Sequence, residues 1–149
     1  MSTPLETIIR QSLLSVPELT SLIGERLYLV QLPQEPTYPA MTFQRISTVP
    51  YSTMNQLGTY APGWQGMGWA RFMFCAWGNG PNSGVEMDQV ARALQLAMST
   101  FNASALPWSP ETLTQAPNFM MTRSMSIEPQ TDPPLFKARI DYRILYQEQ

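Results

Sequence analysis

The residues with chemically useful side chains are few in this chain, and their spacing forms no recognised catalytic or metal-binding pattern. The sequence has no histidine, a single cysteine (Cys75) and a single lysine (Lys137). Without histidine there is no imidazole base and no Ser-His-Asp or Cys-His arrangement. A zinc site would need clustered cysteine or histidine, so we expect no bound metal. Cys75 lies inside an apolar run, which predicts a buried thiol rather than a nucleophile.

Carboxylates are the remaining groups that could act as acids or bases. Glu86 and Asp88 stand two residues apart at an expected helix start, where acidic side chains complement the helix dipole. Asp132 and Asp141 fall in or near an expected hairpin, and neither pair has the spacing of a glycosidase site. The sequence also lacks the glycine-rich loops that bind phosphate groups. We therefore expect no catalytic residue, no cofactor and no enzyme activity.

The composition favours a protein whose surface is covered by partners. Only 13% of the 149 residues are charged, which makes the surface unusual for a free monomer. The net charge of −2 provides no basic field for holding nucleic acid. No apolar run approaches the roughly 20 residues that a membrane-spanning helix needs.

Three segments carry helix signals. The run from Thr3 and Pro4 combines a capping residue with proline at the first helical position. A short helix is expected over residues 17–23, with Ser15 as its cap and Gly24 as its stop. The longest helix begins at a capping sequence over residues 83–86. The expected apolar faces are Leu5, Ile8, Ile9 and Leu13 in the first helix, and Val90, Leu94, Ala97, Met98 and Phe101 in the longest one.

Five segments carry strand signals. Residues 27–32 and 41–49 are expected strands joined by a proline-rich crossover, and the apolar alternation of the second breaks at Arg45 and Ile46. Residues 67–77 are apolar on both faces, as in a central strand covered on both sides. The alternation in residues 119–127 and 136–146 predicts a half-buried antiparallel hairpin.

Together these signals predict one α+β domain over residues 1–149. Its fold would be a mainly antiparallel sheet with an N-terminal helix and one longer helix packed on one face. The segment 50–65 is expected to protrude as a loop or arm, because it has turn residues and aromatics but no charge. A plain connector or a wide hairpin would explain this pattern equally well. The candidate interface residues are Tyr51, Met54, Leu57, Tyr60 and Trp64 in the arm, and Arg139 and Arg143 in the last strand.

Arg139 and Arg143 allow two interpretations. With Arg123 on the neighbouring strand they would form a basic patch. Alternatively, these arginines pair with Asp141 and Glu128 across the hairpin. We favour pairing, because opposite charges on facing strands stabilise a sheet.

The order of several short motifs resembles the tail-completion, or tail-terminator, proteins of long-tailed bacteriophages. Residues 24–47, GERLYLVQLPQEPTYPAMTFQRIS, carry the family's Gly-x-Arg-hydrophobic-Tyr run, a Leu-Pro-Gln, a spaced proline and an Arg-Ile-Ser. ARFMFCAW at 70–77 resembles the family's central strand, VARAL at 90–94 the following helix, and residues 128–146 the closing hairpin. The resemblance covers nearly the whole chain. It departs from the family in the long segments 50–65 and 102–117.

This resemblance implies a structural virion protein that forms a hexameric ring at the head-proximal end of the tail tube. The ring would end tail growth and join the tail to the head connector. The implied partners are further copies of the chain in a homohexamer, the tail tube protein and the head–tail connector protein. Genomic DNA would pass through the lumen without specific binding, and no membrane would be contacted. The implied location is the tail–neck region of the virion, after assembly in the host cytoplasm. We expect an exposed sheet edge or the arm to contact the neighbouring subunit.

Three other functions remain open from the sequence. The chain could be a head-completion or connector subunit of the same phage neck, since these proteins are also small ring-forming subunits. A monomeric adaptor domain is an alternative of another class. An enzyme that relies on carboxylates alone is the third, although no cluster of acidic residues supports it.

Overall fold

Among the residues that the structure describes, five strands form one sheet and three helices lie on one side of it. The computed structural model describes residues 5–50, 67–79, 83–99, 101, 118–128 and 135–147. In chain order the elements are α1 (Leu5–Leu14), α2 (Pro17–Ile23), β1 (Leu27–Leu29), β2 (Ala40–Pro50), β3 (Met67–Gly78), α3 (Ser83–Ser99), β4 (Asn118–Glu128) and β5 (Leu135–Gln147).

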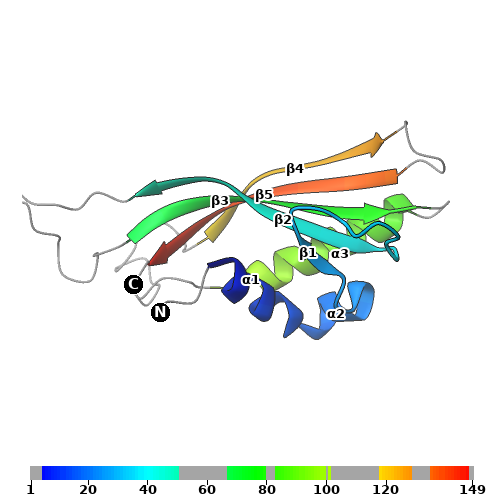
Figure 1. The fold of residues 1–149 in the computed structure, drawn as a ribbon, viewed down its shortest axis with the longest axis horizontal. Coiled ribbons are helices and arrows are strands. Elements are labelled where there is room, and N and C mark those ends of the chain that lie inside the picture. The colour runs from blue at the N-terminus through cyan, green and yellow to red at the C-terminus, as the bar shows by residue number, and fades with distance from the viewer. Residues whose placement is uncertain are drawn as a thin grey trace, which may run out of the picture.

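The strand order in the sheet is β1-β2-β3-β5-β4, so β3 lies in the middle and β4 forms one edge. Strands β2, β3, β5 and β4 are antiparallel to their neighbours, whereas β1 runs parallel to β2. Figure 1 shows the helices together below the sheet. The predicted α+β fold, with a mainly antiparallel sheet and helices on one face, is confirmed.

The short helix α2 follows its sequence signals at one end only. It ends at Gly24, whose φ of +59° suits glycine and whose N–H donates to the Thr20 carbonyl at 2.8 Å. The prediction of Ser15 as its cap is wrong, because the N-cap residue is Val16 and provides no side-chain hydrogen bond. The Ser15 hydroxyl donates instead to a carbonyl one turn earlier, at 2.6 Å.

The buried face of α1 is narrower than its apolar pattern predicted. Leu5, Ile9 and Leu13 are buried, whereas the side chain of Ile8 is 37% exposed. Residues four apart form one stripe along a helix, and a residue next to that stripe is turned away by about 100°. The described helices therefore cover α1 along this single stripe and leave Ile8 outside it.

The strand β1 ends at Leu29 rather than at the expected residue 32. Val30 adopts a φ of +73°, which is unusual for a β-branched residue, and its N–H donates to the Phe43 carbonyl at 2.9 Å. This conformation stops the parallel pairing with β2. Leu29 and Val30 are 52% and 58% exposed, so the β1 edge of the sheet ends in apolar side chains.

The strand β2 contains a β-bulge, which explains the break in its apolar alternation. Its register to β3 shifts between Arg45 and Ser47, and Ile46 between them is 41% exposed. A bulge adds one residue, so the side chains beyond it point to the other face. Ser47 consequently lies on the other face, whereas Arg45, before the bulge, stays on the helical side with Phe43 and binds Glu6 of α1, with Nε 2.9 Å from Oε1.

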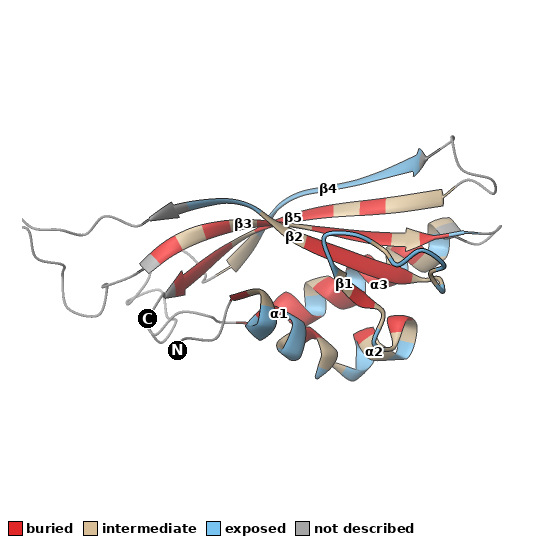
Figure 2. Cartoon of the chain, viewed as in Figure 1, coloured by how far each residue is buried: buried red, intermediate tan, exposed pale blue. Residues whose placement is uncertain are grey.

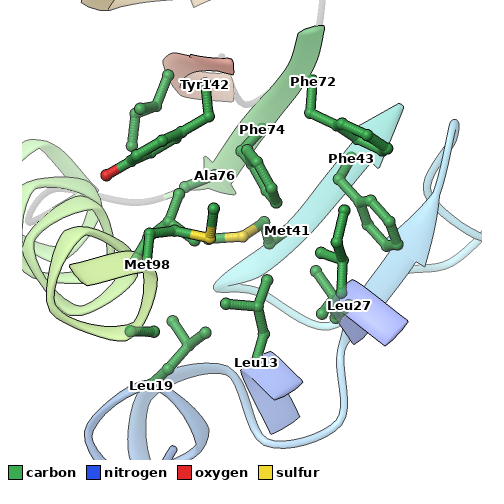
Figure 3. Close-up of a cluster of buried hydrophobic side chains, with 14 of the residues drawn as sticks. Leu13, Leu19, Leu27, Met41, Phe43, Phe72, Phe74, Ala76, Met98 and Tyr142 are labelled. Carbon is green, nitrogen blue, oxygen red and sulfur yellow. The ribbon is translucent and has the colours of Figure 1, made fainter. Parts of the chain in front are cut away.

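The hydrophobic core lies between the helices and one face of the sheet. Phe43, Phe72 and Phe74 pack with ring centroids 5.9 to 6.4 Å apart, and Tyr142 meets Phe74 edge-on at 6.0 Å. Such aromatic pairs stabilise a core beyond the area they bury. Figure 3 shows the other labelled side chains around them, namely Leu13, Leu19, Leu27, Met41, Ala76 and Met98. The predicted apolar face of α3 is confirmed, because Val90, Leu94, Ala97, Met98 and Phe101 are all buried.

The other face of the sheet has no described element over it (Figures 1 and 2), and we call it the open face. Covering on both sides was predicted for β3, and no described element provides the second cover, although Cys75 on the open face is buried. Phe72 and Phe74 are buried on the helical side, but Trp69, Arg71 and Met73 on the open face stay partly exposed. The strand β3 therefore has apolar side chains on both faces, but the described helices cover only one of them.

The strand β4 is an exposed edge rather than the half-buried strand that its pattern predicted. Residues 121–127 are all exposed, as the pale blue of β4 in Figure 2 shows. Met121, Met125 and Ile127 are 41%, 48% and 53% exposed. The longest helix lies over the middle of the sheet and leaves this edge largely uncovered. The alternation correctly indicated apolar side chains that need cover, but the described chain does not provide it.

Replacing Leu94 with alanine should lower the free energy of unfolding by about 2–5 kcal/mol, because it leaves a cavity beneath the sheet. The side chain of Leu94 is 0% exposed. Leu96→Ala is the matched control, since Leu96 lies on the same helix and is 53% exposed. Its effect should stay within about 0.5 kcal/mol. Urea denaturation followed by circular dichroism measures both, and equal losses would contradict this orientation of α3.

Candidate interface on the open sheet face

The open face is formed by side chains that alternate with the buried ones along each strand. Its character is aromatic and cationic, and aromatic and arginine side chains are enriched at protein interfaces. Its described members include Trp69, Arg71, Met73, Cys75 and Trp77 of β3, Lys137, Arg139, Asp141, Arg143 and Leu145 of β5, Phe119 of β4, and Ser47 of β2.

A buried carboxylate lies at the centre of this face. The side chain of Asp141 is only 1% exposed although no described helix covers it, and the guanidinium groups of Arg71 and Arg139 lie against it. Arg71 Nη2 donates to its Oδ2 at 2.7 Å, and Arg139 Nε donates to its Oδ1 at 3.0 Å. A second bond from Arg139 Nη2 to Oδ2, at 3.2 Å, makes this contact bidentate.

These contacts determine the charge state of Asp141. Burial by itself raises the pKa of the carboxyl group, but the hydrogen bonds and positive charges of Arg139 and Arg71 outweigh burial. The pKa of Asp141 is therefore lowered below its ordinary value. At neutral pH Asp141 is therefore an anion, and it holds Arg71 of β3 and Arg139 of β5 against the sheet.

The remaining cations of the open face rest on aromatic rings. The guanidinium carbon of Arg143 lies 4.6 Å from the ring centroid of Trp69 and 5.8 Å from that of Phe119. The ammonium of Lys137 lies 5.2 Å from the centroid of Trp77. Cation–π contacts at partly exposed sites stabilise by about 0.5–1 kcal/mol each. They keep the long side chains flat, so the face is ordered before any partner binds.

Charge is unevenly distributed between this face and the rest of the chain. Four of the nine cations, Arg71, Lys137, Arg139 and Arg143, lie on the open face, where Asp141 is the only acid among the described side chains. The described open face therefore carries a net +3, and since the whole chain carries −2, its remainder carries a net −5. A cationic face on an acidic protein favours contact with negatively charged surfaces.

The two candidate arginines are both on the open face, but they act differently. Arg139 pairs with Asp141 as we favoured, but along the same strand β5 rather than across the hairpin, whereas Arg143 stacks on aromatic rings. The alternative patch that includes Arg123 is wrong. Arg123 pairs in register with the buried Ile140 and lies on the helical side. Its guanidinium binds α3 there, donating to the Asp88 carboxylate and, at 3.1 Å, to Gln95 Oε1.

The arm residues cannot be placed in this interface. Tyr51, Met54, Leu57, Tyr60 and Trp64 lie outside the described residues, so their role stays a prediction. The sequence reasoning missed Trp69, Arg71, Lys137 and Asp141 as interface candidates. The alternation of β3 was the available signal, because it placed Trp69 and Arg71 on one face with Met73, Cys75 and Trp77.

Cys75 is buried, as the sequence predicted. Its side chain is 2% exposed, and burial raises the pKa of its thiol despite the nearby Lys137 and Arg139, which act in the opposite direction. Such a thiol is a poor nucleophile at neutral pH. Within the described ranges, no three acidic, cysteine or histidine side chains are grouped to hold a metal ion, and no helix there is long and apolar enough to cross a membrane.

Comparison with known proteins leaves the family open but supports the fold. No protein-family model matches the sequence, and no curated protein matches it. Among solved structures, a chain of the "Virion of native gene transfer agent (GTA) particle" is similar, with a TM-score of 0.58 and 12% identity. The match covers 97% of this chain and 95% of that chain. At this identity the likeness shows a shared fold, an α+β domain with one helix-covered sheet face.

Replacing Asp141 with asparagine should lower the free energy of unfolding by about 1–3 kcal/mol near pH 7, because two arginines lose their anion. Arg71 and Arg139 are 39% and 42% exposed, so water screens part of the loss. The folded pKa of Asp141 is lowered, so its stabilisation is complete above the unfolded value and lost as pH falls through the folded pKa.

The wild-type chain should therefore lose stability below about pH 4, and Asp141→Asn should lose less over that range. Urea denaturation at several pH values measures this difference. Glu35→Gln is the control, because Glu35 is an exposed carboxylate with no ion pair among the described residues. An unchanged acid dependence in Asp141→Asn would show that the Asp141 contacts do not stabilise the fold.

Proposed function

We propose that this chain is a structural virion protein that forms a ring at the head-proximal end of a phage tail tube. In that role it ends tail growth and joins the tail to the head connector. One observation carries the proposal: the sheet exposes an ordered aromatic and cationic face together with a long apolar edge strand. Both surfaces suit permanent contact with other proteins.

Two further lines support a virion protein. The fold is shared with a chain of a gene transfer agent virion particle. The sequence motifs over residues 24–47, 70–77, 90–94 and 128–146 resemble the tail-terminator family in their order.

The edge strand β4 is the proposed contact with the neighbouring subunit. It is 11 residues long, its outer side pairs with no described strand, and Met125 and Ile127 on it are about half exposed. A contact between two different surfaces of identical subunits is head-to-tail, and it closes into a ring when the rotation closes. The β1 edge at the other end of the sheet, with exposed Leu29 and Val30, provides a different surface of that kind.

The proposed partners follow from this position. They are further copies of the chain in a hexamer, the tail tube protein below the ring and the connector protein above it. A net charge of −2 is compatible with a lumen through which DNA passes without specific binding. The proposed function involves assembly alone and needs no catalytic step.

Removing this gene from a phage that carries it should give overlong or ragged tails beside tail-less, DNA-filled heads, because nothing stops tube growth or joins the two parts. Electron microscopy of the particles measures this, and supplying the gene from a plasmid is the control. Finished tails of normal length beside leaking heads would place the protein on the head side of the neck. Wild-type particles would contradict a structural role.

A double replacement on the edge strand, Met125→Glu with Ile127→Glu, should abolish ring formation, because it places charge in an apolar contact. The monomer should stay folded, since both side chains are about half exposed. Ile8→Glu on α1, at a partly exposed apolar position away from β4, is the matched control. Sedimentation velocity and circular dichroism measure assembly and folding. Rings from the double variant would move the subunit contact away from β4.

A further inference from the structure

A small pocket on the open face lies between two arginines that the sheet places opposite each other. Arg71 of β3 is paired in register with Arg143 of β5. The pocket has a volume of about 170 Å³ and is lined by these arginines with Ser47, Trp69 and Met121. Like charges directly opposite on neighbouring strands are destabilising. The pocket is therefore a place where an added negative charge would stabilise the protein.

The donors around this pocket are only partly used. Arg71 gives Nη2 to Asp141, but its Nε is buried and has no hydrogen-bond partner. Arg143 contacts no carboxylate among the described residues, and its guanidinium lies over the Trp69 ring instead. Stacking leaves the N–H groups of a guanidinium free in its plane. The positive charges of Arg71 and Arg143 beside a small pocket match a planar carboxylate, which can accept two hydrogen bonds from the exposed guanidinium of Arg143.

Two exposed carboxylates of the same chain, Glu18 and Glu25, lie on the helical side of the sheet. Glu18 lies in the first turn of α2 and Glu25 follows its C-cap, Gly24; both are exposed and have no ion-pair partner among the described residues. The nearby Arg26 is occupied by the Pro39 and Leu22 carbonyls, at 2.8 and 3.3 Å. Figure 1 shows α2 on the helical side, away from the open face. These carboxylates cannot reach the pocket of their own chain, but those of a second copy can.

We propose that the pocket between Arg71 and Arg143 binds a carboxylate of Glu18 or Glu25 from the adjacent copy of this chain. The inference rests on the proposed ring, and it adds the charge contact that determines the direction of assembly. Met121 lines the pocket and is an exposed residue of β4, so a copy that covers the edge strand is also next to the pocket. The cationic open face of one subunit then faces Glu18 and Glu25 on the helical side of the next.

The test uses two charge-reversed variants of the full chain, Arg143→Glu and the double variant Glu18→Lys with Glu25→Lys. Arg143 is chosen because Arg71 also holds Asp141. Alone, each variant places like charges at every contact, so self-association should weaken by at least about tenfold. Mixed in equal amounts, the two should assemble again, because every contact in an alternating ring joins opposite charges. Sedimentation velocity at low salt measures all three samples.

Several outcomes separate this inference from the proposed function. If the wild-type chain assembles and Arg143→Glu assembles equally well, the pocket is not a subunit contact although the ring remains. If the mixture does not assemble while Arg143→Gln also fails, the occupant is not Glu18 or Glu25. If the wild type stays monomeric at high concentration, the proposed ring itself is overturned.

Two controls make the result specific. Arg92→Glu reverses a 75% exposed cation on α3, and mixing it with the Glu18 and Glu25 double variant should restore nothing. Circular dichroism confirms that Arg143→Glu is folded, and Arg143→Gln replaces it if it is not.

Duplex DNA is the competing ligand for the pocket. If the chain binds DNA in a salt-sensitive way, and Arg143→Gln loses this binding while its assembly is unchanged, the pocket is a phosphate site and the proposal is overturned.

Discussion

The unequal covering of the central sheet is the constraint on which the rest of the structure depends. Three helices pack against one face, where Phe43, Phe72 and Phe74 form the centre of the core. No described element covers the other face, although β3 presents large apolar side chains there as well. The apolar area of such a face must be covered either by the chain's own side chains or by a partner, because its exposure to water is unfavourable.

The long side chains of the open face lie over its own apolar surface. Asp141 is an anion buried by Arg71 and Arg139, while Arg143 and Lys137 lie flat over Trp69 and Trp77. Each contact is modest in energy, but together they exclude water from the middle of the sheet and keep the face ordered. An ordered surface loses less conformational entropy on binding, and this favours a stable assembly over a transient one.

The same features connect the monomer to the proposed ring. The edge strand β4 provides an apolar surface, and the cationic open face, together with the exposed carboxylates Glu18 and Glu25 on the helical side, provides a direction. Apolar area stabilises association without orienting it, whereas complementary charge selects which surfaces meet. A subunit with both properties can add to its own kind in one orientation, which is what a closed head-to-tail ring requires.

The sequence by itself determined the elements and their faces. The alternation in β5 and β3, the stop at Gly24 and the apolar stripe of α3 all appear as predicted, because these signals come from residues close together in the chain. Only the tertiary structure decided that β4 is an edge, that Ile8 is exposed, and that Arg123 lies on the helical side. It also decided that Arg71 stands opposite Arg143 and that Asp141 joins two strands. These facts depend on strand order, register and bulges, which bring together residues about 70 positions apart, and local sequence carries no signal for them.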